Sequence, residues 1–290
     1  MQPPPPMPST RPSATAWRKF RRNRFALAAL VAFVLISALC LLSRLLLDAD
    51  PNAIDLSATL RPPSATHWLG TDQTGRDMLA RTLAAGRVSI GVGAGSVLLA
   101  LLIGTVLGGL AGYFGGRVDM LVMRVVDLVM TFPPIIVLLT LAAVIGPGTG
   151  KTMLIIGLLS WPLVCRLVRA RVLSVREMDY VAAARTLGAG HAYILLRHCL
   201  PNTVDVLVVF TSLGFVTAIM AEAGLSFLGL GVQLPDASWG SLVGIAREAA
   251  VMKQYPWIWL PASLCIVGTA LAVNYIGDGL RQLVDPKADA

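Results

Sequence analysis

The stretch DYVAAARTLGAGHAYILLRHCLPN, from Asp179 to Asn202, is a polar and basic island between hydrophobic blocks of the chain. Its first half carries three consecutive alanines at 182–184, and alanine is the strongest helix former, so we expect a short helix there. Gly188 and Gly190 follow, and the sequence predicts that these glycines end the helix.

The second half of the island is expected to form another short helix, over roughly residues 192–200. We expect it to end at Pro201, where the next hydrophobic block starts. A helix, a glycine turn and a second helix would thus be held between two hydrophobic blocks. Such a unit, with a smooth alanine face at a membrane surface, suits docking into a groove on a partner protein.

The composition places the chain among all-α polytopic membrane proteins. Of its 290 residues, 56% are hydrophobic and 14% charged, and the mean hydropathy is +0.72. Soluble domains are about 45–50% apolar and about 25% charged. The net charge of +8 is better explained by basic cytoplasmic loops than by a nucleic-acid partner. The four cysteines have no paired spacing, and we interpret them as small apolar residues.

Hydrophobic runs and basic clusters predict six transmembrane helices with both termini in the cytoplasm. No cleavage site follows the first hydrophobic run, so we expect an uncleaved span and not a signal peptide. The expected regions are a disordered, basic cytoplasmic N-terminus at 1–24, a first transmembrane helix at 25–47, an extracytoplasmic segment at 48–87, a five-helix core at 88–280 with a cytoplasmic loop at 173–203, and a cytoplasmic tail at 281–290.

Glycines and prolines mark two of the expected spans. In the second span, predicted over 88–116, glycine recurs every four residues from Gly104 to Gly112, which indicates a face for close helix packing. The third span, predicted from Asp119 to about Ile145, contains Pro133 and Pro134. Two adjacent prolines are expected to kink or break that helix.

Two further features resemble functional sites. The segment GPGTGKT at 146–152 is similar to a nucleotide-binding loop, but that motif needs glycine where Ile145 stands, so we expect a turn. Glu222 is the one interior charge of the fifth span, predicted over 204–230. An ionisable residue at membrane depth normally faces a pore or another subunit, or it is a hydrogen-bonded acid tying two helices together. We find no catalytic constellation, no metal cluster and no cofactor motif.

The island closely resembles the EAA loop of ABC importer inner-membrane subunits. That loop reads Glu-Ala-Ala, three residues, Gly, nine residues, a hydrophobic residue, one more, and Leu-Pro. Here Ala182 stands at the Glu position and His198 at the first hydrophobic position near the end. The resemblance implies an ATPase-coupling role for Asp179, Tyr180, Ala182, Ala183, Ala184, Gly188, Ala189, Leu200 and Pro201.

Two other stretches are similar to the dipeptide, oligopeptide and nickel importer permeases: HWLGTDQTGRDMLAR, from His67 to Arg81, and EAGLSFLGLG, at 222–231. The resemblance implies the second permease subunit of such an importer, with the type I permease fold, in a prokaryotic cell membrane. It makes Pro133 and Pro134 candidates for the pore lining, with a bent packing helix as the alternative.

The same resemblance implies the partners: a homologous permease, two ABC ATPase subunits that hydrolyse the ATP, and an extracytoplasmic binding protein. Peptides are the expected substrates, with nickel, glutathione or another small solute as alternatives. A membrane enzyme or a channel acting alone would instead need clustered intramembrane His, Asp or Glu residues. The spans contain one glutamate and no cluster, which favours the permease.

Overall fold

The computed structural model describes residues 23–47 and 50–284, and this part of the chain is helical throughout apart from its connecting segments. The helices in chain order are α2 (Arg24–Leu46), η1 (Leu56–Ala58), α3 (Met78–Phe114), α4 (Gly116–Thr131), α5 (Pro134–Ile145), α6 (Thr149–Arg176), α7 (Asp179–Thr186), α8 (His191–Ile194), η2 (Leu195–Cys199), η3 (Leu200–Thr203), α9 (Val204–Phe227), α10 (Trp239–Gly244), η4 (Ile245–Arg247), α11 (Ala249–Gln254) and α12 (Pro256–Val284).

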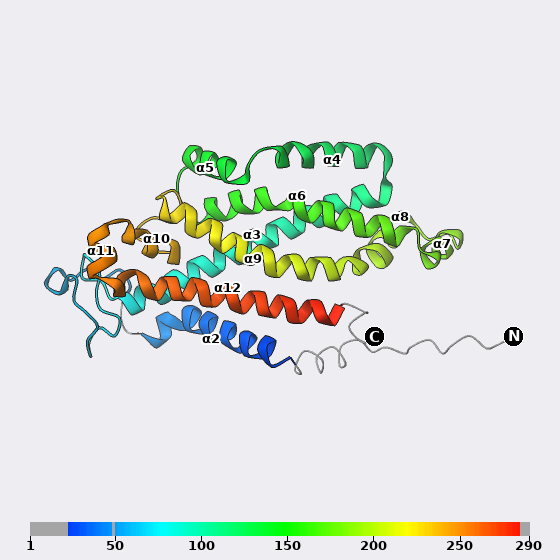
Figure 1. Cartoon of the computed structure of the whole chain (residues 1–290). Coiled ribbons are helices and arrows are strands. Elements are labelled where there is room, and N and C mark those ends of the chain that lie inside the picture. The colour runs from blue at the N-terminus through cyan, green and yellow to red at the C-terminus, as the bar shows by residue number, and fades with distance from the viewer. Residues whose placement is uncertain (1–22, 48–49, 285–290) are drawn as a thin grey trace.

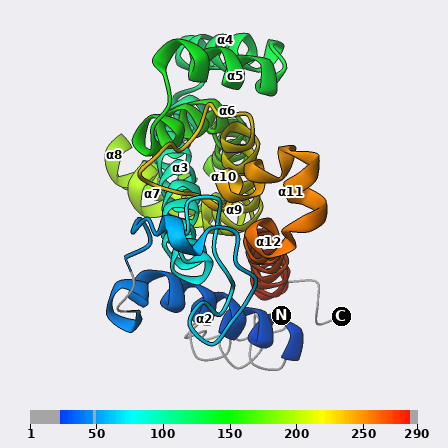
Figure 2. The same cartoon turned by 90° about the vertical axis from the view of Figure 1, so that its left-hand side faces the viewer.

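Helix α3 is the central helix of the bundle, as the end-on view in Figure 2 shows. It packs mainly along α6 and also contacts α9 and α2, while α12 lies against α9 and α2. The short helix α7 projects at one end of the bundle, and α10 and α11 lie at the opposite end (Figure 1). We call the end opposite α7 the distal end.

The glycine repeat of the second span is confirmed as a close-packing face, and its partner is α6. A Cβ atom on Gly104 would lie 2.4 Å from Cβ of Val164, and one on Gly108 would lie 2.5 Å from the carbonyl oxygen of Cys165. Only glycine allows two helix backbones to approach this closely. This contact fixes α6, and with it the chain that continues into α7.

Alanine substitutions at two glycines of α3 are expected to change the stability of the subunit in opposite directions. Gly108→Ala should destabilise the subunit by about 1–3 kcal/mol, because its Cβ would overlap the backbone of α6. Gly91→Ala should stabilise it by about 0.5–1 kcal/mol, because no atom lies within 4 Å of that Cβ and alanine favours the helix. Thermal unfolding of the detergent-purified protein compares the two variants. Equal melting temperatures would contradict the close packing.

Five single helices of the described chain are long and apolar enough to cross a membrane, and α4 with α5 makes a sixth candidate as a bent pair. With the bent pair counted as one span, the number agrees with the six spans predicted. The two members of the pair are bent by 85°, and Pro133 and Pro134 stand at the break, so the predicted effect of the prolines is also confirmed. Apolar side chains of α4 and α5 point away from the bundle, as Leu121 and Ile136 do at 67% and 58% exposure.

Two predicted helix boundaries are wrong. Helix α3 begins at Met78 and not near residue 88, because Asp77 caps it: Oδ1 of Asp77 accepts from the Ala80 N–H at 2.9 Å. The second helix of the island does not end at Pro201 either, since the chain is helical from His191 to Phe227.

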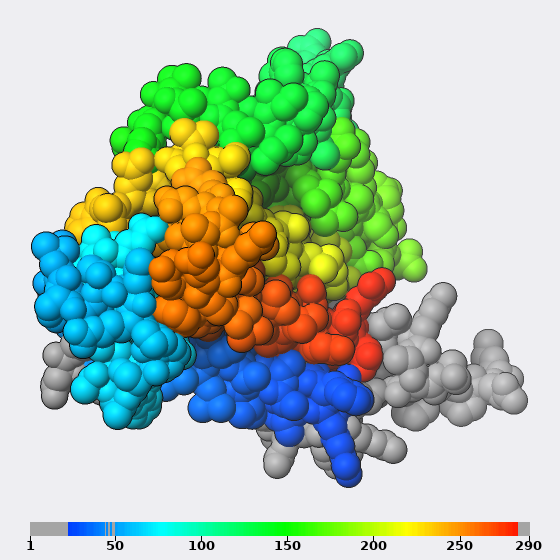
Figure 3. Space-filling model, turned by 60° about the vertical axis from the view of Figure 1, so that its left-hand side comes forward, coloured from blue at the N-terminus to red at the C-terminus, as the bar shows by residue number. Residues whose placement is uncertain are grey.

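The distal end is closed by segments that are far apart in sequence. In Figure 3 the loop before α3 and the helices α10 and α11 form one continuous surface. Trp257, at the start of α12, donates its indole N–H to the carbonyl oxygen of Thr71 at 3.3 Å. Trp239 of α10 is fully buried and donates its indole N–H to the Thr82 carbonyl at 3.0 Å. The first contact attaches the loop before α3 to α12, and the second attaches α10 to the first turns of α3.

Candidate functional site

The predicted loop helix is present as α7, at the tip of the bundle. Val181 is fully buried and anchors it, whereas Ala182 and Ala183 are exposed and Ala184 is half-buried. Asp179 lies in the first turn and Arg185 in the last, where each charge is favourable for the helix dipole. The alanine face predicted for docking is therefore open in this chain.

Helix α7 also carries an apolar stripe. Tyr180, Ala183 and Leu187 follow one another at three- and four-residue spacing, which places them on one face of a helix. Tyr180 is 43% exposed and Leu187 is 88% exposed. We did not predict Leu187 from the sequence, although the spacing from Tyr180 contains the signal. An apolar stripe beside small alanines is the pattern that inserts into a protein groove.

Gly188 ends α7 through a Schellman motif. Its φ angle is +84°, its N–H donates to the Arg185 carbonyl at 3.1 Å, and the Ala189 N–H donates to the Ala184 carbonyl at 3.0 Å. The glycine is needed for this left-handed conformation. A larger side chain at Gly188 is expected to meet backbone or partner atoms. Within the described chain nothing lies within 4 Å of a Cβ there, so the contact with a partner stays a prediction.

The second half of the island holds α7 against the bundle. Leu200 is half-buried, and its Cδ2 would lie 3.1 Å from a Cβ on Gly109 of α3, whereas Pro201 is exposed. The side-chain amide of Asn202 donates to the Tyr180 hydroxyl at 3.3 Å, and Arg171 donates from Nε to the Asn202 carbonyl at 2.9 Å. Leu200 therefore has a packing role and Pro201 faces outward.

Arg176 connects this loop to the end of α3. Its Nη1 donates to the carbonyl oxygens of Gly112 and Tyr113, at 3.0 and 3.2 Å. The Tyr113 hydroxyl in turn lies 3.0 Å from Nδ1 of His191. Cationic donors at a helix C-terminus satisfy carbonyls that the helix leaves unpaired. The sequence places Arg176 at the end of a basic run with Arg166, Arg169 and Arg171, and it does not predict this contact.

The structure decides between the two expectations for Glu222. Its side chain is 0% exposed and lies inside the subunit, so it faces neither a pore nor another subunit, and the expected hydrogen-bonded acid that ties two helices together is confirmed. Ser89 of α3 donates to Oε2 at 2.9 Å, and Ser226 donates to Oε1 at 2.6 Å. The two serine oxygens accept backbone N–H groups of Trp239 and Val232, at 3.1 and 3.0 Å. The carboxylate thus joins α9, α3 and the segment leading into α10.

Ion pairs connect the broken span to α6. Asp127 of α4 pairs with Arg166 at 2.5 Å, and Asp119 pairs with Arg169. A cavity of about 280 Å³ lies beside the proline break, with Pro134, Pro162 and Phe210 among its lining residues. The prolines are thus next to a crevice that three spans share. Whether a pore follows this crevice stays a prediction.

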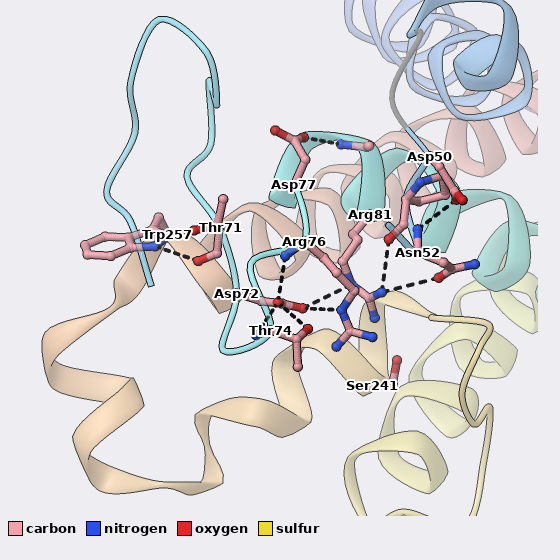
Figure 4. A network of polar contacts seen from close by, with 12 residues as sticks. Asp50, Asn52, Thr71, Asp72, Thr74, Arg76, Asp77, Arg81, Ser241 and Trp257 are labelled. Atoms are coloured by element: carbon pink, nitrogen blue, oxygen red, sulfur yellow. Dashed lines mark hydrogen bonds and ion pairs between the residues drawn. The ribbon is translucent and has the colours of Figure 1, made fainter. Parts of the chain in front are cut away.

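At the distal end, Asp72 organises the stretch from His67 to Arg81 (Figure 4). Its Oδ1 accepts from the N–H and hydroxyl of Thr74 and from the N–H of Arg76, all at 2.8 to 3.0 Å. Arg76 donates from Nε to Oδ2 at 2.7 Å. Burial alone would raise the pKa of Asp72, but the hydrogen bonds from Thr74 and Arg76 outweigh it and hold the pKa below its usual range. This network orders the loop.

Two family models match different parts of the chain. A family model described as "Binding-protein-dependent transport system inner membrane component" matches residues 104–290, which include α7 and the rest of the island. A second model, described as "N-terminal TM domain of oligopeptide transport permease C", matches residues 12–63.

Relatives match over almost the whole chain. A protein of Brucella suis biovar 1 whose name describes it as a peptide permease protein is 47% identical over 281 residues, which cover 97% of this chain and 93% of that protein. A glutathione transport system permease protein of Pectobacterium atrosepticum is 39% identical over 272 residues, covering 93% and 90%.

Solved structures are also similar in fold. One of them is titled "Crystal structure of an amino acid ABC transporter with histidines", and the TM-score is 0.51 at 14% sequence identity, covering 69% of this chain and 92% of that one. At this identity the likeness concerns the fold alone. Together with the family model and the relatives, it leads to one conclusion: this chain belongs to the family of inner-membrane components of binding-protein-dependent transport systems.

Proposed function

We propose that this chain is a pore-forming permease subunit of an ATP-driven peptide importer, and that α7 couples it to an ATPase subunit. The observation that carries the proposal is the open face of α7, with exposed Ala182 and Ala183 beside the apolar stripe of Tyr180, Ala183 and Leu187. Small and apolar residues on a short, well-ended helix fit a groove of a partner protein.

The coupling role requires a rigid connection between α7 and the spans. Arg176, which precedes α7, donates hydrogen bonds to the end of α3. The buried hydrogen bond between Ser89 and Glu222 joins α3 to α9. A push on α7 would therefore move α6, α3 and α9 together. The subunit supplies no catalysis in this scheme; ATP hydrolysis belongs to two separate ABC ATPase subunits, and a homologous permease supplies the other half of the pore.

The orientation follows from charge. Arg171, Arg176, Arg185 and Arg197 gather at the end that carries α7, and basic residues favour the cytoplasmic side. We therefore place α7 and both termini in the cytoplasm. The distal end then faces outward, where an extracytoplasmic binding protein would deliver the substrate.

Peptide is the substrate class that the relatives favour. The model matching residues 12–63 is described for oligopeptide transport, and the Brucella relative is named as a peptide permease. The glutathione permease of Pectobacterium makes glutathione, itself a tripeptide, the main alternative.

Reconstitution of the full complex in proteoliposomes tests the proposal. With the permease pair, the ATPases and the binding protein present, addition of dipeptides should stimulate ATP hydrolysis and peptide uptake. Glutathione and nickel ions should be tested at the same concentrations. Stimulation of ATP hydrolysis by nickel alone would identify the chain as a nickel permease subunit. A rate of ATP hydrolysis that does not depend on the binding protein would contradict an importer.

A further inference from the structure

We infer that a cavity at the distal end binds the free carboxylate of a small zwitterionic peptide, with Arg76 and Arg81 as the receiving groups. The cavity has a volume of about 380 Å³ and lies between the loop before α3, the loop after α9, and α10. This volume is within the range of small-ligand sites, roughly 300–1,000 Å³. Figure 4 shows both arginines reaching toward Asp72, with Ser241 of α10 below them.

The two guanidinium groups have donors left over. Arg76 uses its backbone N–H and Nε on Asp72, and its terminal nitrogens donate to no acceptor among the described residues. Arg81 is only 3% exposed. Its Nη1 donates to the Pro51 carbonyl and Asn52 Oδ1, at 3.2 and 3.4 Å, while its buried Nε has no hydrogen bond within the described chain. A planar guanidinium with free terminal nitrogens is suited to bidentate binding of a carboxylate.

Charge at the cavity wall points to the same ligand class. Asp72 is the only carboxylate paired with either arginine in the described residues, at 2.7 Å from Nε of Arg76 and 3.6 Å from Nε of Arg81. One acid therefore serves two guanidinium groups in a largely buried place, and no second carboxylate of the described residues lies within ion-pair distance of either. Buried charges are normally paired, so an anionic ligand would complete this site.

Asp236 makes the cavity suit a zwitterion. It is an exposed residue that lines the same cavity, and it has no ion pair or hydrogen bond within the described part of the chain. A free ammonium group is the natural partner of such a carboxylate. A molecule with both a free carboxylate and a free ammonium, as in a short peptide, matches both groups. This assignment rests on the proposed peptide importer, since it makes the cavity a contact for the delivered substrate.

The test is equilibrium binding to the assembled membrane complex in nanodiscs, without the binding protein. The probe is radiolabelled alanyl-alanine, compared with its C-terminal amide and its N-acetyl form. We expect saturable binding of the dipeptide and at least about tenfold weaker binding of the amide, because the amide loses the charge-assisted hydrogen bonds. Arg76→Gln should abolish the preference for the free carboxylate.

Two variants separate the site from the stability of the loop. Arg61→Gln is the matched control, because Arg61 is exposed in the same segment and does not line the cavity, and it should bind normally. Asp236→Asn breaks no observed contact, so it should fold normally and lose the preference for dipeptide over its N-acetyl form. Equal binding of dipeptide and amide, or no saturable binding at all, would overturn the inference.

Failure of the inference and failure of the proposed function give different results. Peptide uptake by the full system without binding at this cavity would overturn the site and leave the importer intact. Binding of the dipeptide at this cavity without any peptide uptake by the full system would support the site and overturn the proposed importer function. If Arg76→Gln binds the dipeptide normally but loses stimulation by the binding protein, the arginines receive an acidic side chain of that protein, and the small-ligand site is wrong.

Discussion

Glutamate at position 188 is expected to abolish transport while the permease stays folded and inserted. Gly188 has a φ angle of +84°, so a glutamate there costs about 1–2 kcal/mol of backbone strain. No atom of the described chain lies within 4 Å of the new Cβ, so the substitution creates no clash at that atom. The loss of transport would instead come from a charged, reoriented chain beside the docking face of α7. Peptide uptake and co-purification of the ATPase subunits measure it.

Two control variants identify the cause. Gly188→Asn should retain most transport, because asparagine tolerates the left-handed conformation and keeps the Schellman motif. Gly150→Glu introduces the same charge at an exposed glycine at the distal end of α6 and should transport normally. Normal peptide-stimulated ATP hydrolysis in Gly188→Glu would show that this loop is not the coupling element.

Removal of the Glu222 side chain is expected to give the largest loss of stability in the subunit. In Glu222→Ala, the hydroxyls of Ser89 and Ser226 lose their acceptor in a site that is 0% exposed. A buried donor left without a partner costs about 1–3 kcal/mol, and the cavity adds to this. We therefore expect poor membrane levels and a melting temperature lowered by many degrees in thermal unfolding.

The glutamine variant separates packing from transport. Glu222→Gln keeps the shape and one acceptor oxygen, and its amide can donate to a serine oxygen. Because the side chain does not reach a pore, a purified Glu222→Gln complex should transport peptide at close to the wild-type rate. Transport lost at normal protein levels and normal thermal stability would mean that the carboxylate acts in the transport cycle, against the position that the structure gives it.

Local signals in the sequence were sufficient for the main features of the fold. Hydropathy gave the number of spans, and the glycine spacing from Gly104 to Gly112 gave the packing face, because both properties depend on residues within one helix. Pro133 and Pro134 marked the break for the same reason, since proline acts on its own backbone. Gly188 was found from the EAA spacing, and its positive φ is the physical reason for the glycine.

Long-range contacts explain what the sequence did not predict. Arg87 is the last charge before an uncharged run, so the second span is predicted from residue 88, whereas α3 begins at Met78. The charge of Arg81 within the helix is accommodated by Asp72 and by the Pro51 carbonyl. Pro201 was read as a helix end, but the π turn at 195–199 and the 3-10 turn at 200–203 accommodate its missing N–H within a helical run. The partner of Glu222, Ser89, is 133 residues away in the sequence.

Cross-linking from α7 tests the coupling claim most directly. A cysteine at Ala183, in the assembled complex treated with a short bismaleimide, should cross-link to an ATPase subunit, and addition of ATP should change the yield. A cysteine at Thr149, at the distal end, should give no such product and should react with an impermeant maleimide only from outside. Cross-linking of Ala183→Cys to the binding protein, or of Thr149→Cys to the ATPase, would contradict the account.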